Sequence, residues 1–476
     1  MLFTSLEFLL FLPVAVALFW VLPGGLRLHW LMLASLVFYA SFGIGNLAYL
    51  AAVAGLTLAA SAAIRRAQNR RTRRLALSLG LTAVLGLLVF LKFYDPIAAA
   101  TGALPASGLR NPAGFSFYAF MAASLLIDRY RRPAPGATPY RDGLYLAWFP
   151  KILAGPITRA GDFLFEIRRN RRAHAALFVL GAQLILWGLL KKVVVADNLA
   201  PFVDRTYAIP AYAVPMELMI ASYFFAFQIY CDFSGYTDIA RGVSFLFGIR
   251  LAENFRRPYF ARSVGEFWSE RWHITLAHWF RDYLYIPLGG SRVGRPRFYL
   301  NIMVVFVISG LWHAGLGYGV GWGFLVWGAL NGAYIWGERA LAPLGAALRR
   351  HAKGWFARAI GRCLAALVVF HLVLISWVFF RAASLSDGWT VLTRIFAALP
   401  ELPALLLRYP FTAEHAFLAC LILGLLVIEF LDERRPLWRR LARMPRPLRW
   451  GAVYAGIFAL LLLGRWQSEA FVYMQF

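Results

Sequence analysis

Charged residues and cysteines are scarce in this chain of 476 residues, and their scarcity excludes several classes of protein. Only 15% of the residues are charged and 61% are hydrophobic, with a mean hydropathy of +0.61. This excludes an ordinary soluble domain, because many runs reach the roughly 20 apolar residues that span a bilayer. Three cysteines, odd in number and irregular in spacing, support neither a disulfide framework nor a cysteine-based metal site. We predict an all-α polytopic bundle of about 11 or 12 spans, forming a single domain over residues 1–476.

Acidic residues are also few, since 23 aspartates and glutamates stand against 49 lysines and arginines, for a net charge of +26. That charge could suit nucleic acid, but the sequence has no solvated basic domain to bind it, so we expect no nucleic-acid partner. The arginines gather instead in short connectors between apolar runs, where they favour the cytoplasmic side and anionic lipid headgroups. These basic connectors are Arg65–Arg74, Arg129–Pro133, Arg168–Arg172, Arg349–Arg358 and Asp432–Arg449.

The alternate connectors, Tyr94–Asn111, Asp197–Tyr212 and Ala383–Thr412, are nearly neutral. With an even number of crossings, this alternation predicts that both termini lie outside. The first span lacks a basic leading region and a small-residue cleavage site, so we expect it to remain as an anchor. The predicted spans lie near Phe3–Leu22, Leu28–Ile44, Leu47–Ile64, Leu75–Phe93, Phe115–Ile127, Ala176–Val195, Val214–Cys231, Asn301–Trp312, Gly319–Trp336, Leu364–Phe380, Ala416–Phe430 and Trp450–Leu463.

One histidine lies within an otherwise lipid-soluble run. His313, in NIMVVFVISGLWHAG, costs several kcal/mol at that depth unless it lines a cavity or has a partner, so it is a candidate for the functional site. The alternative is a buried histidine that is hydrogen-bonded to a neighbouring helix. His371, in VVFHLVLISW, has no small residues or second functional group nearby, and we interpret it as structural.

The region Asp232–Arg297 is too polar to span and too aromatic for an ordinary loop, so we predict short helices within or against the membrane. On a continuous helix, at about 100° per residue, Glu266, Glu270 and His273 share one face. The opposite face carries Trp268, Trp272, Thr275 and Trp279. The alternative is that these aromatic residues are interfacial anchors and that His273 lies on a solvated face.

Other signals are weaker. The glycines of SGLWHAGLGYGVGWG permit close backbone approach, which suits either a tunnel wall or helix packing. We expect nearby polar groups to pair with the arginines Arg256, Arg257 and Arg262; these groups are Asp232, Asp238, Glu253 and Asn254. The sequence contains no Gly-rich phosphate loop, HExxH, GxSxG or CxxC, so nothing in it supports an ATPase, a zinc protease or an ordinary serine hydrolase.

Three long blocks carry a specific resemblance: FQIYCDFSGYTDIARG (Phe227–Gly242), LAENFRRPYFARSVGEFWSERWHITLAHWFRDYLYIPLGG (Leu251–Gly290) and NIMVVFVISGLWHAG (Asn301–Gly315). They closely resemble the membrane-bound O-acyltransferase family, in the bacterial branch with the membrane subunit of alginate O-acetylation and the D-alanyl transfer protein of teichoic acids. The signature region covers residues 227–315, followed by the C-terminal spans of residues 360–476. Further similar pieces extend the resemblance over essentially the whole chain: FPKILAGPITR (Phe149–Arg159), WGLLKKVVVADNLA (Trp187–Ala200), ISWVFFRA (Ile375–Ala382) and FVYMQF (Phe471–Phe476).

The resemblance implies roles for two histidines. His313 matches the family's signature histidine at the bottom of a membrane funnel, and His273 matches its second, more polar histidine. In the family an acyl group from a cytoplasmic donor passes through a tunnel to a hydroxyl on the far side. We expect His313 to act as the general base, and His273 to orient the donor or to stabilise the oxyanion together with backbone amides of the glycine-rich segment.

The resemblance also implies ligands, partners and a location. We expect an acyl-CoA type donor, acetyl first, as substrate, with no bound cofactor and no metal. Its phosphates would meet Arg256, Arg257, Arg271 and Arg281. Tunnel-lining candidates are Gly310, Trp312, Gly315 and Asp238. The expected partners are membrane lipids, a polysaccharide acceptor such as alginate and an extracytoplasmic SGNH-type acyltransferase, at a bacterial inner membrane with periplasmic termini. Met474 replaces an aromatic residue common in relatives, which leaves the choice of partner open.

Two other functional classes stay open at this point. A transporter predicts paired broken helices in two related halves, and we find no internal repeat. A non-catalytic scaffold of a polysaccharide synthesis complex predicts that replacement of His313 is silent in cells. The sequence leaves the acceptor polymer, the acyl group and the oligomeric state undetermined.

Overall fold

The computed structural model describes residues 1–102, 104–132, 138–168, 174–314, 321–351, 354–434, 440–441, 443–466 and 471. Helices make up most of these residues, and the described ranges contain no β-strand. The prediction of an all-α polytopic fold is therefore confirmed.

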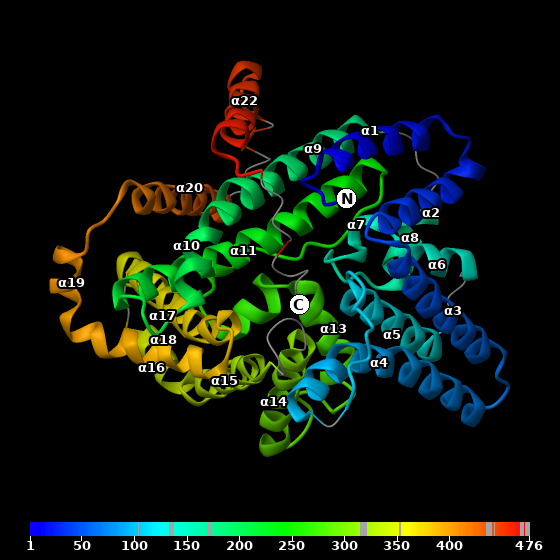
Figure 1. Cartoon of the computed structure of the whole chain (residues 1–476), viewed down its shortest axis with the longest axis horizontal. Helices are drawn as coiled ribbons and strands as arrows, with labels where there is room; N and C mark the ends of the chain where they lie inside the picture. The colour runs from blue at the N-terminus through cyan, green and yellow to red at the C-terminus, as the bar shows by residue number, and fades with distance from the viewer. Residues whose placement is uncertain are drawn as a thin grey trace.

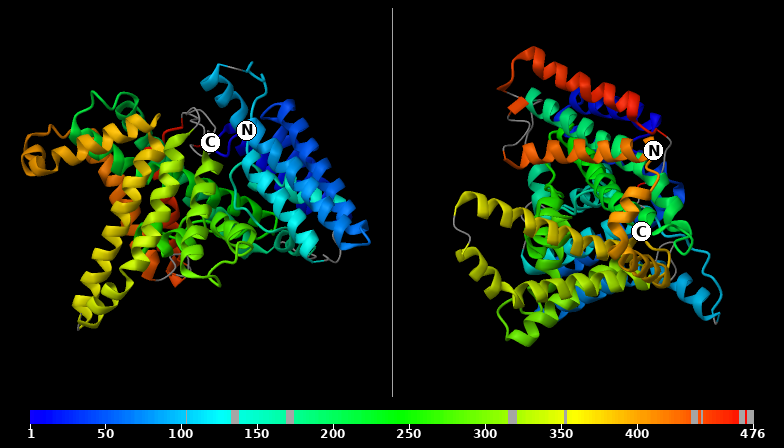
Figure 2. Two further views of the ribbon diagram at one scale, coloured as in Figure 1. Left: turned by 90° about the horizontal axis from the view of Figure 1, so that it is seen from below. Right: turned by 90° about the vertical axis from the view of Figure 1, so that its left-hand side faces the viewer.

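The first helices form one end of the molecule, on the right of Figure 1 and in the left view of Figure 2. Helices α3, α4 and α5 pack against one another there. The side-chain oxygen of Asn69 accepts a hydrogen bond from the backbone N–H of Thr72 at the start of α4, and Gly114, with φ 71°, directly precedes α5. Their bounds are α1 Leu6–Val21, α2 Gly24–Ala40, α3 Ile44–Arg66, α4 Arg70–Thr101 and α5 Phe115–Arg131.

Helix α11 (Pro215–Leu246) is the central helix, and most of its residues are buried. Helix α9 packs along it so closely that a Cβ on Gly188 would lie 2.6 Å from the carbonyl oxygen of Gly235. Only glycine permits such an approach between the two backbones. The elements before α11 are α6 Pro139–Ala147, α7 Phe149–Ile152, α8 Ala160–Arg168, α9 Ala175–Leu189, the π-helix η1 Leu190–Ala196 and α10 Asp197–Ala208.

Our prediction that this span ends at Cys231 was wrong, because α11 continues through the polar residues that follow. The carboxylate of Asp232 lies 2.7 Å from Lys192 Nζ, and that of Asp238 lies 2.6 Å from Lys191 Nζ. Both lysines belong to η1. Because a lysine of the neighbouring element η1 pairs with each aspartate, α11 can remain helical through these acidic residues.

The chain after Gly248 does form short helices, as predicted. The assignment of Glu266, Glu270 and His273 to one face of a continuous helix was wrong. The backbone leaves the helix at Trp272, and His273 takes a left-handed conformation with φ 43° before α13 begins. Glu270 is exposed whereas His273 is 3% exposed, so the predicted acidic face beside His273 does not exist. The short elements are η2 Pro258–Phe260, α12 Val264–Glu266, η3 Phe267–Arg271, α13 Ile274–Phe280 and η4 Arg281–Tyr285.

Helices α16 to α20 lie at the other end, in yellow and orange on the left of Figure 1, whereas α22, in red, packs against η1 and α9. Helices α14 and α15 pack side by side, and a Cβ on Gly310 would lie 2.3 Å from the carbonyl oxygen of Phe324. Gly310 thus serves helix packing, one of the two roles left open for these glycines. The elements are α14 Arg295–His313, α15 Trp322–Ala340, α16 Ala342–His351, α17 Trp355–Arg381, α18 Leu385–Ala398, η5 Leu399–Glu401, α19 Leu402–Arg408, α20 Ala413–Arg434 and α22 Arg446–Leu463.

Seven helical segments within the described ranges are long and apolar enough to cross a membrane. One of them, Leu385–Arg408, lies inside the predicted neutral connector Ala383–Thr412, so that stretch is helical, and its role as a connector stays a prediction. The other predicted spans also form helices, some of them too short to qualify by length, such as α2 and α5 with 17 residues each. The number of crossings and the sides on which the termini lie stay predictions. The qualifying segments are Ile44–Arg66, Arg70–Thr101, Ala175–Ala208, Trp355–Arg381, Leu385–Arg408, Ala413–Arg434 and Arg446–Leu463.

Candidate functional site

His273 is held in a strained loop between η3 and α13. The backbone N–H of Arg256 donates to Arg271 O at 2.9 Å, and that of Ile274 donates to Asn254 O at 2.9 Å. The loop segments around residues 254–256 and 271–274 therefore lie side by side. Among the described residues other than glycine, only Arg257 (φ 42°) and His273 (φ 43°) have positive φ. Such conformations cost about 1–3 kcal/mol each and persist where the surroundings impose them, which makes this loop a candidate functional site.

A chain of hydrogen bonds orients the imidazole of His273. The backbone N–H of Ile157 donates to Thr275 Oγ1 at 3.0 Å, and Thr275 Oγ1 donates to Asn254 Oδ1 at 2.8 Å. His273 Nδ1 lies 3.0 Å from the same Asn254 oxygen. A carbonyl oxygen only accepts, so Nδ1 carries the hydrogen in this arrangement, and Nε2 of a neutral imidazole carries the lone pair.

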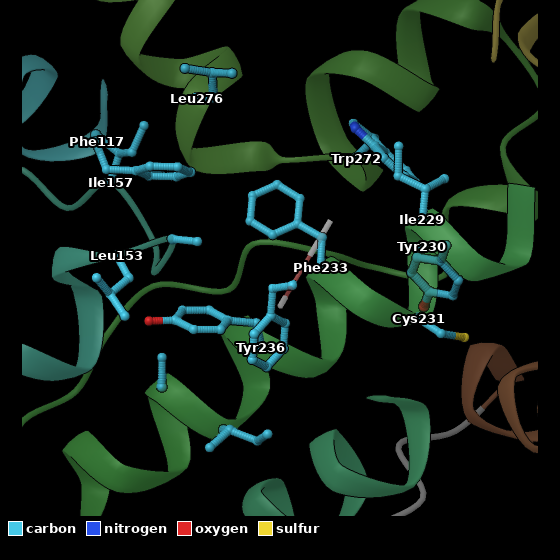
Figure 3. Close-up of a cluster of buried hydrophobic side chains, with 14 of the residues drawn as sticks. Phe117, Leu153, Ile157, Ile229, Tyr230, Cys231, Phe233, Tyr236, Trp272 and Leu276 are labelled. Carbon is cyan, nitrogen blue, oxygen red and sulfur yellow. The ribbon is translucent and has the colours of Figure 1, made fainter. Parts of the chain in front are cut away.

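Aromatic rings enclose His273. Its ring centroid lies 4.7 Å from that of Phe233 and 6.2 Å from those of Phe117 and Phe255. Figure 3 shows Phe117, from α5, and Phe233, from α11, beside each other in the buried core. The imidazole therefore occupies an apolar region in which it can hydrogen-bond only to a few fixed groups.

His313 is the last residue of α14, and it is also buried, with 3% exposure. Its ring centroid lies 4.7 Å from Trp312, 5.3 Å from Trp327 and 5.2 Å from Phe380. Trp312 contacts His273 as well, with 6.3 Å between ring centroids. The structure thus brings the two predicted histidines, from separate segments of the chain, against one tryptophan.

An ion cluster fixes the loop that carries His273. Arg271 Nε lies 2.7 Å from Glu266 Oε1, and Arg271 Nη2 lies 2.8 Å from Glu433 Oε1. Arg257 pairs with Glu433 at 2.6 Å and also with Asp432. Because both of these acids come from the end of α20, the cluster ties that distant helix to the strained loop.

The four arginines that we predicted for donor binding all have carboxylate partners. Arg256 pairs with Glu253 at 2.8 Å, Arg281 pairs with Asp282 at 2.9 Å, and Arg257 and Arg271 belong to the ion cluster. The side chains of Arg256 and Arg281 are each 50% exposed, whereas that of Arg271 is 8% exposed.

The predicted tunnel-lining residues do not converge on one point. Trp312 contacts both histidines, and Gly310 packs against α15. Asp238 lies in a separate ion group with Lys191 and Arg241, at 2.6 and 3.1 Å. Gly315 lies outside the described residues, as does Met474.

The expected pairing of polar groups with the arginine cluster was correct for Glu253 but wrong for Asp232, Asp238 and Asn254. Sequence reasoning named Asn254 but missed that it orients His273, and it placed Asp432 and Glu433 in a basic connector without predicting their contacts with Arg257 and Arg271. The position of Asn254 inside the long signature block was the available signal. His371 fits its structural interpretation, since its two ring nitrogens lie 2.8 Å from Tyr223 OH and 2.7 Å from Leu367 O.

Comparison with known proteins places this core within a family. Residues 143–370 match the family described as MBOAT, membrane-bound O-acyltransferase family, and this range includes both buried histidines. The chain is 35% identical over 412 residues to a probable alginate O-acetylase of Azotobacter vinelandii, covering 83% of this chain and 78% of that protein.

Other relatives have different named activities. A peptidoglycan O-acetyltransferase of Helicobacter pylori is 32% identical over 395 residues, covering 76% of this chain and 72% of the relative. A teichoic acid D-alanyltransferase of Bacillus subtilis is 26% identical over 220 residues, covering 44% of this chain and 55% of that protein. With an all-helical fold, long apolar helices and this extent of similarity, the chain belongs to the membrane-bound O-acyltransferase family and is an O-acyltransferase of a membrane.

Proposed function

We propose that the protein passes an acyl group, acetyl first, from a cytoplasmic acyl-CoA donor across a bacterial inner membrane to a hydroxyl group outside. The acceptor would be an exopolysaccharide, reached directly or through an SGNH-type acyltransferase partner. Relatives named alginate O-acetylase and peptidoglycan O-acetyltransferase support acetyl transfer to a polymer. The observation that carries the proposal is the meeting of His273 and His313 at Trp312 in a buried aromatic core.

His313 is the proposed general base. A hydroxyl is a poor nucleophile near neutral pH, so it needs a neutral imidazole to take its proton as it attacks the acyl carbon. The same imidazolium would then protonate the leaving thiolate of coenzyme A. Enclosure by Trp312, Trp327 and Phe380 supports this role, because an apolar site favours the neutral imidazole over the imidazolium.

His273 is the proposed partner that orients the donor or stabilises the oxyanion. The relay through Asn254 gives its ring a defined tautomer and a defined orientation, which a positioning or stabilising group needs. For the phosphates of the donor we propose Arg256 and Arg281, because their guanidinium groups are half exposed and can exchange their carboxylate partners for a phosphate. Arg257 and Arg271 instead hold the loop through the ion cluster.

The activity is tested with purified protein in proteoliposomes that receive acetyl-CoA labelled in the acetyl group on the side of the basic connectors. Transfer of label to a soluble alginate or other polysaccharide acceptor, or to an added SGNH-type partner, is the expected result. Movement of polymer across the membrane without acylation would instead indicate a transporter. If neither occurs with either acceptor, the proposed donor and acceptors are wrong.

Replacement of Asn254 by alanine is expected to lower the turnover number about 10- to 100-fold, because His273 loses the acceptor that sets its tautomer. Labelled acetyl transfer by the proteoliposomes measures the effect. Asn301→Ala is the matched control, since Asn301 is equally buried but donates to Leu288 O and Gly290 O away from both histidines. Equal losses in the two variants would contradict the orienting role of Asn254.

A further inference from the structure

Lys92 is a buried cation that the proposed reaction does not use. It lies in α4, where the apolar run Leu75–Tyr94 contains no other charged residue, and it is 2% exposed. No carboxylate among the described residues lies within ion-pair distance of it, whereas the equally buried Lys191 and Lys192 each pair with aspartates. A charge buried inside a membrane protein costs several kcal/mol, so its presence at this place calls for a function.

The ammonium group of Lys92 caps the end of the helix that carries His313. Lys92 Nζ donates a hydrogen bond to the backbone oxygen of Trp312, and it also lies 5.7 Å from the Trp312 ring centroid. The last carbonyl groups of a helix lack partners within that helix. At the end of α14, the N–H of Ala314 lies 3.0 Å from Gly310 O and 3.2 Å from Leu311 O, so Trp312 O is the next carbonyl in line.

This contact joins α4 to the residue directly before His313. A cation is favoured at a helix C-terminus, because the exposed carbonyl groups carry partial negative charge there. Helix α5, which packs against α4, supports the same tryptophan through Phe117 and Phe120, with ring centroids 5.3 and 5.5 Å from Trp312. The end of α14 is therefore held by α4 through a hydrogen bond and by α5 through ring packing.

We infer that Lys92 is a positioning residue that clamps the C-terminal end of α14 and thereby holds His313 in its working place. The inference rests on the proposed function of His313, but the clamp itself is a structural property that can be measured separately. A displacement of about 1 Å in a catalytic group can lower a rate about 100-fold. Loss of a hydrogen bond that fixes the peptide next to His313 is therefore expected to lower the rate of the reaction.

The kinetic test compares Lys92→Met, which keeps the length of the side chain but removes the donor, with Lys92→Arg, which keeps a cationic donor. We expect Lys92→Met to lower the turnover number of the folded enzyme at least about tenfold, with KM for acetyl-CoA within about threefold of wild type. Lys92→Arg is expected to recover most of that loss. Leu88→Ala, from a buried position one turn earlier in α4, is the control for general destabilisation.

Hydrogen–deuterium exchange of the peptide Ser309–Ala314 tests the clamp without any assay of activity. We expect faster exchange there in Lys92→Met than in wild type or Leu88→Ala. Unchanged exchange, or a turnover loss no larger than that of Leu88→Ala, would overturn the inference. If exchange rises as expected but His313→Ala retains activity, the proposed function fails and the clamp stands.

Discussion

Alanine at position 313 is expected to lower acyl transfer at least about 1,000-fold, because general base catalysis alone contributes about 100- to 10,000-fold to such reactions. The imidazole of His313 lies in an aromatic core formed by Trp312, Trp327 and Phe380. The measurement is transfer of labelled acetyl groups in proteoliposomes, normalised to the amount of folded and inserted enzyme.

His371→Ala is the matched control for that experiment. His371 also lies in an apolar run, but its ring nitrogens are hydrogen-bonded to Tyr223 and to the carbonyl of Leu367, away from the aromatic core. We expect this variant to keep its turnover within about threefold of wild type. Retention of more than about a tenth of the wild-type rate by His313→Ala would show that His313 is not the base.

Methionine in place of Lys192 is expected to destabilise the protein by about 3–5 kcal/mol, because removal of one partner from a buried ion pair leaves an uncompensated charge. Lys192 Nζ lies 2.7 Å from carboxylate oxygens of both Asp197 and Asp232, and all three residues are buried. Without the cation, α10 would bury Asp197 and α11 would bury Asp232 in an apolar interior with no cation beside them. The midpoint of thermal unfolding in detergent, with the yield of monodisperse protein, measures the effect.

Two further variants define the origin of that loss. The double variant Lys192→Met with Asp232→Asn removes one charge of each sign, and we expect it to recover part of the stability. Arg205→Met breaks an exposed ion pair with Glu414, whose side chains are 64% and 47% exposed, and is expected to cost less than about 1 kcal/mol. If Lys192→Met unfolds at the same temperature as Arg205→Met, the prediction that the buried ion pair contributes more stability than the exposed one is wrong.

The helical class and the apolar surroundings of His313 could be predicted from the sequence, because both depend on local composition. A long apolar run must form a helix in a bilayer, where its backbone groups have no other partner. His313 stands out because its surroundings in the sequence are apolar, and the structure places it in a buried core. The interpretation of His371 as structural depended on the same local contrast.

The local geometry around His273 could not be predicted in the same way. A helical wheel assumes a continuous helix. Here the backbone leaves the helix at Trp272 and His273, where Arg256 N–H donates to Arg271 O and Ile274 N–H donates to Asn254 O. The partners of that loop, Asp432 and Glu433, lie far along the chain at the end of α20. No local pattern in the segment itself indicates such partners.

The sequence alone determined that this protein resides in a membrane and that a histidine lies among apolar residues, since composition and hydrophobic runs set the free energy of transfer into a bilayer. Only the tertiary structure decided which groups touch the histidines. Trp312 meets both rings, Asn254 sets the tautomer of His273, and Lys92 caps the helix that ends at His313. These contacts join residues distant in sequence, and their energies depend on distances that arise only when the helices have packed.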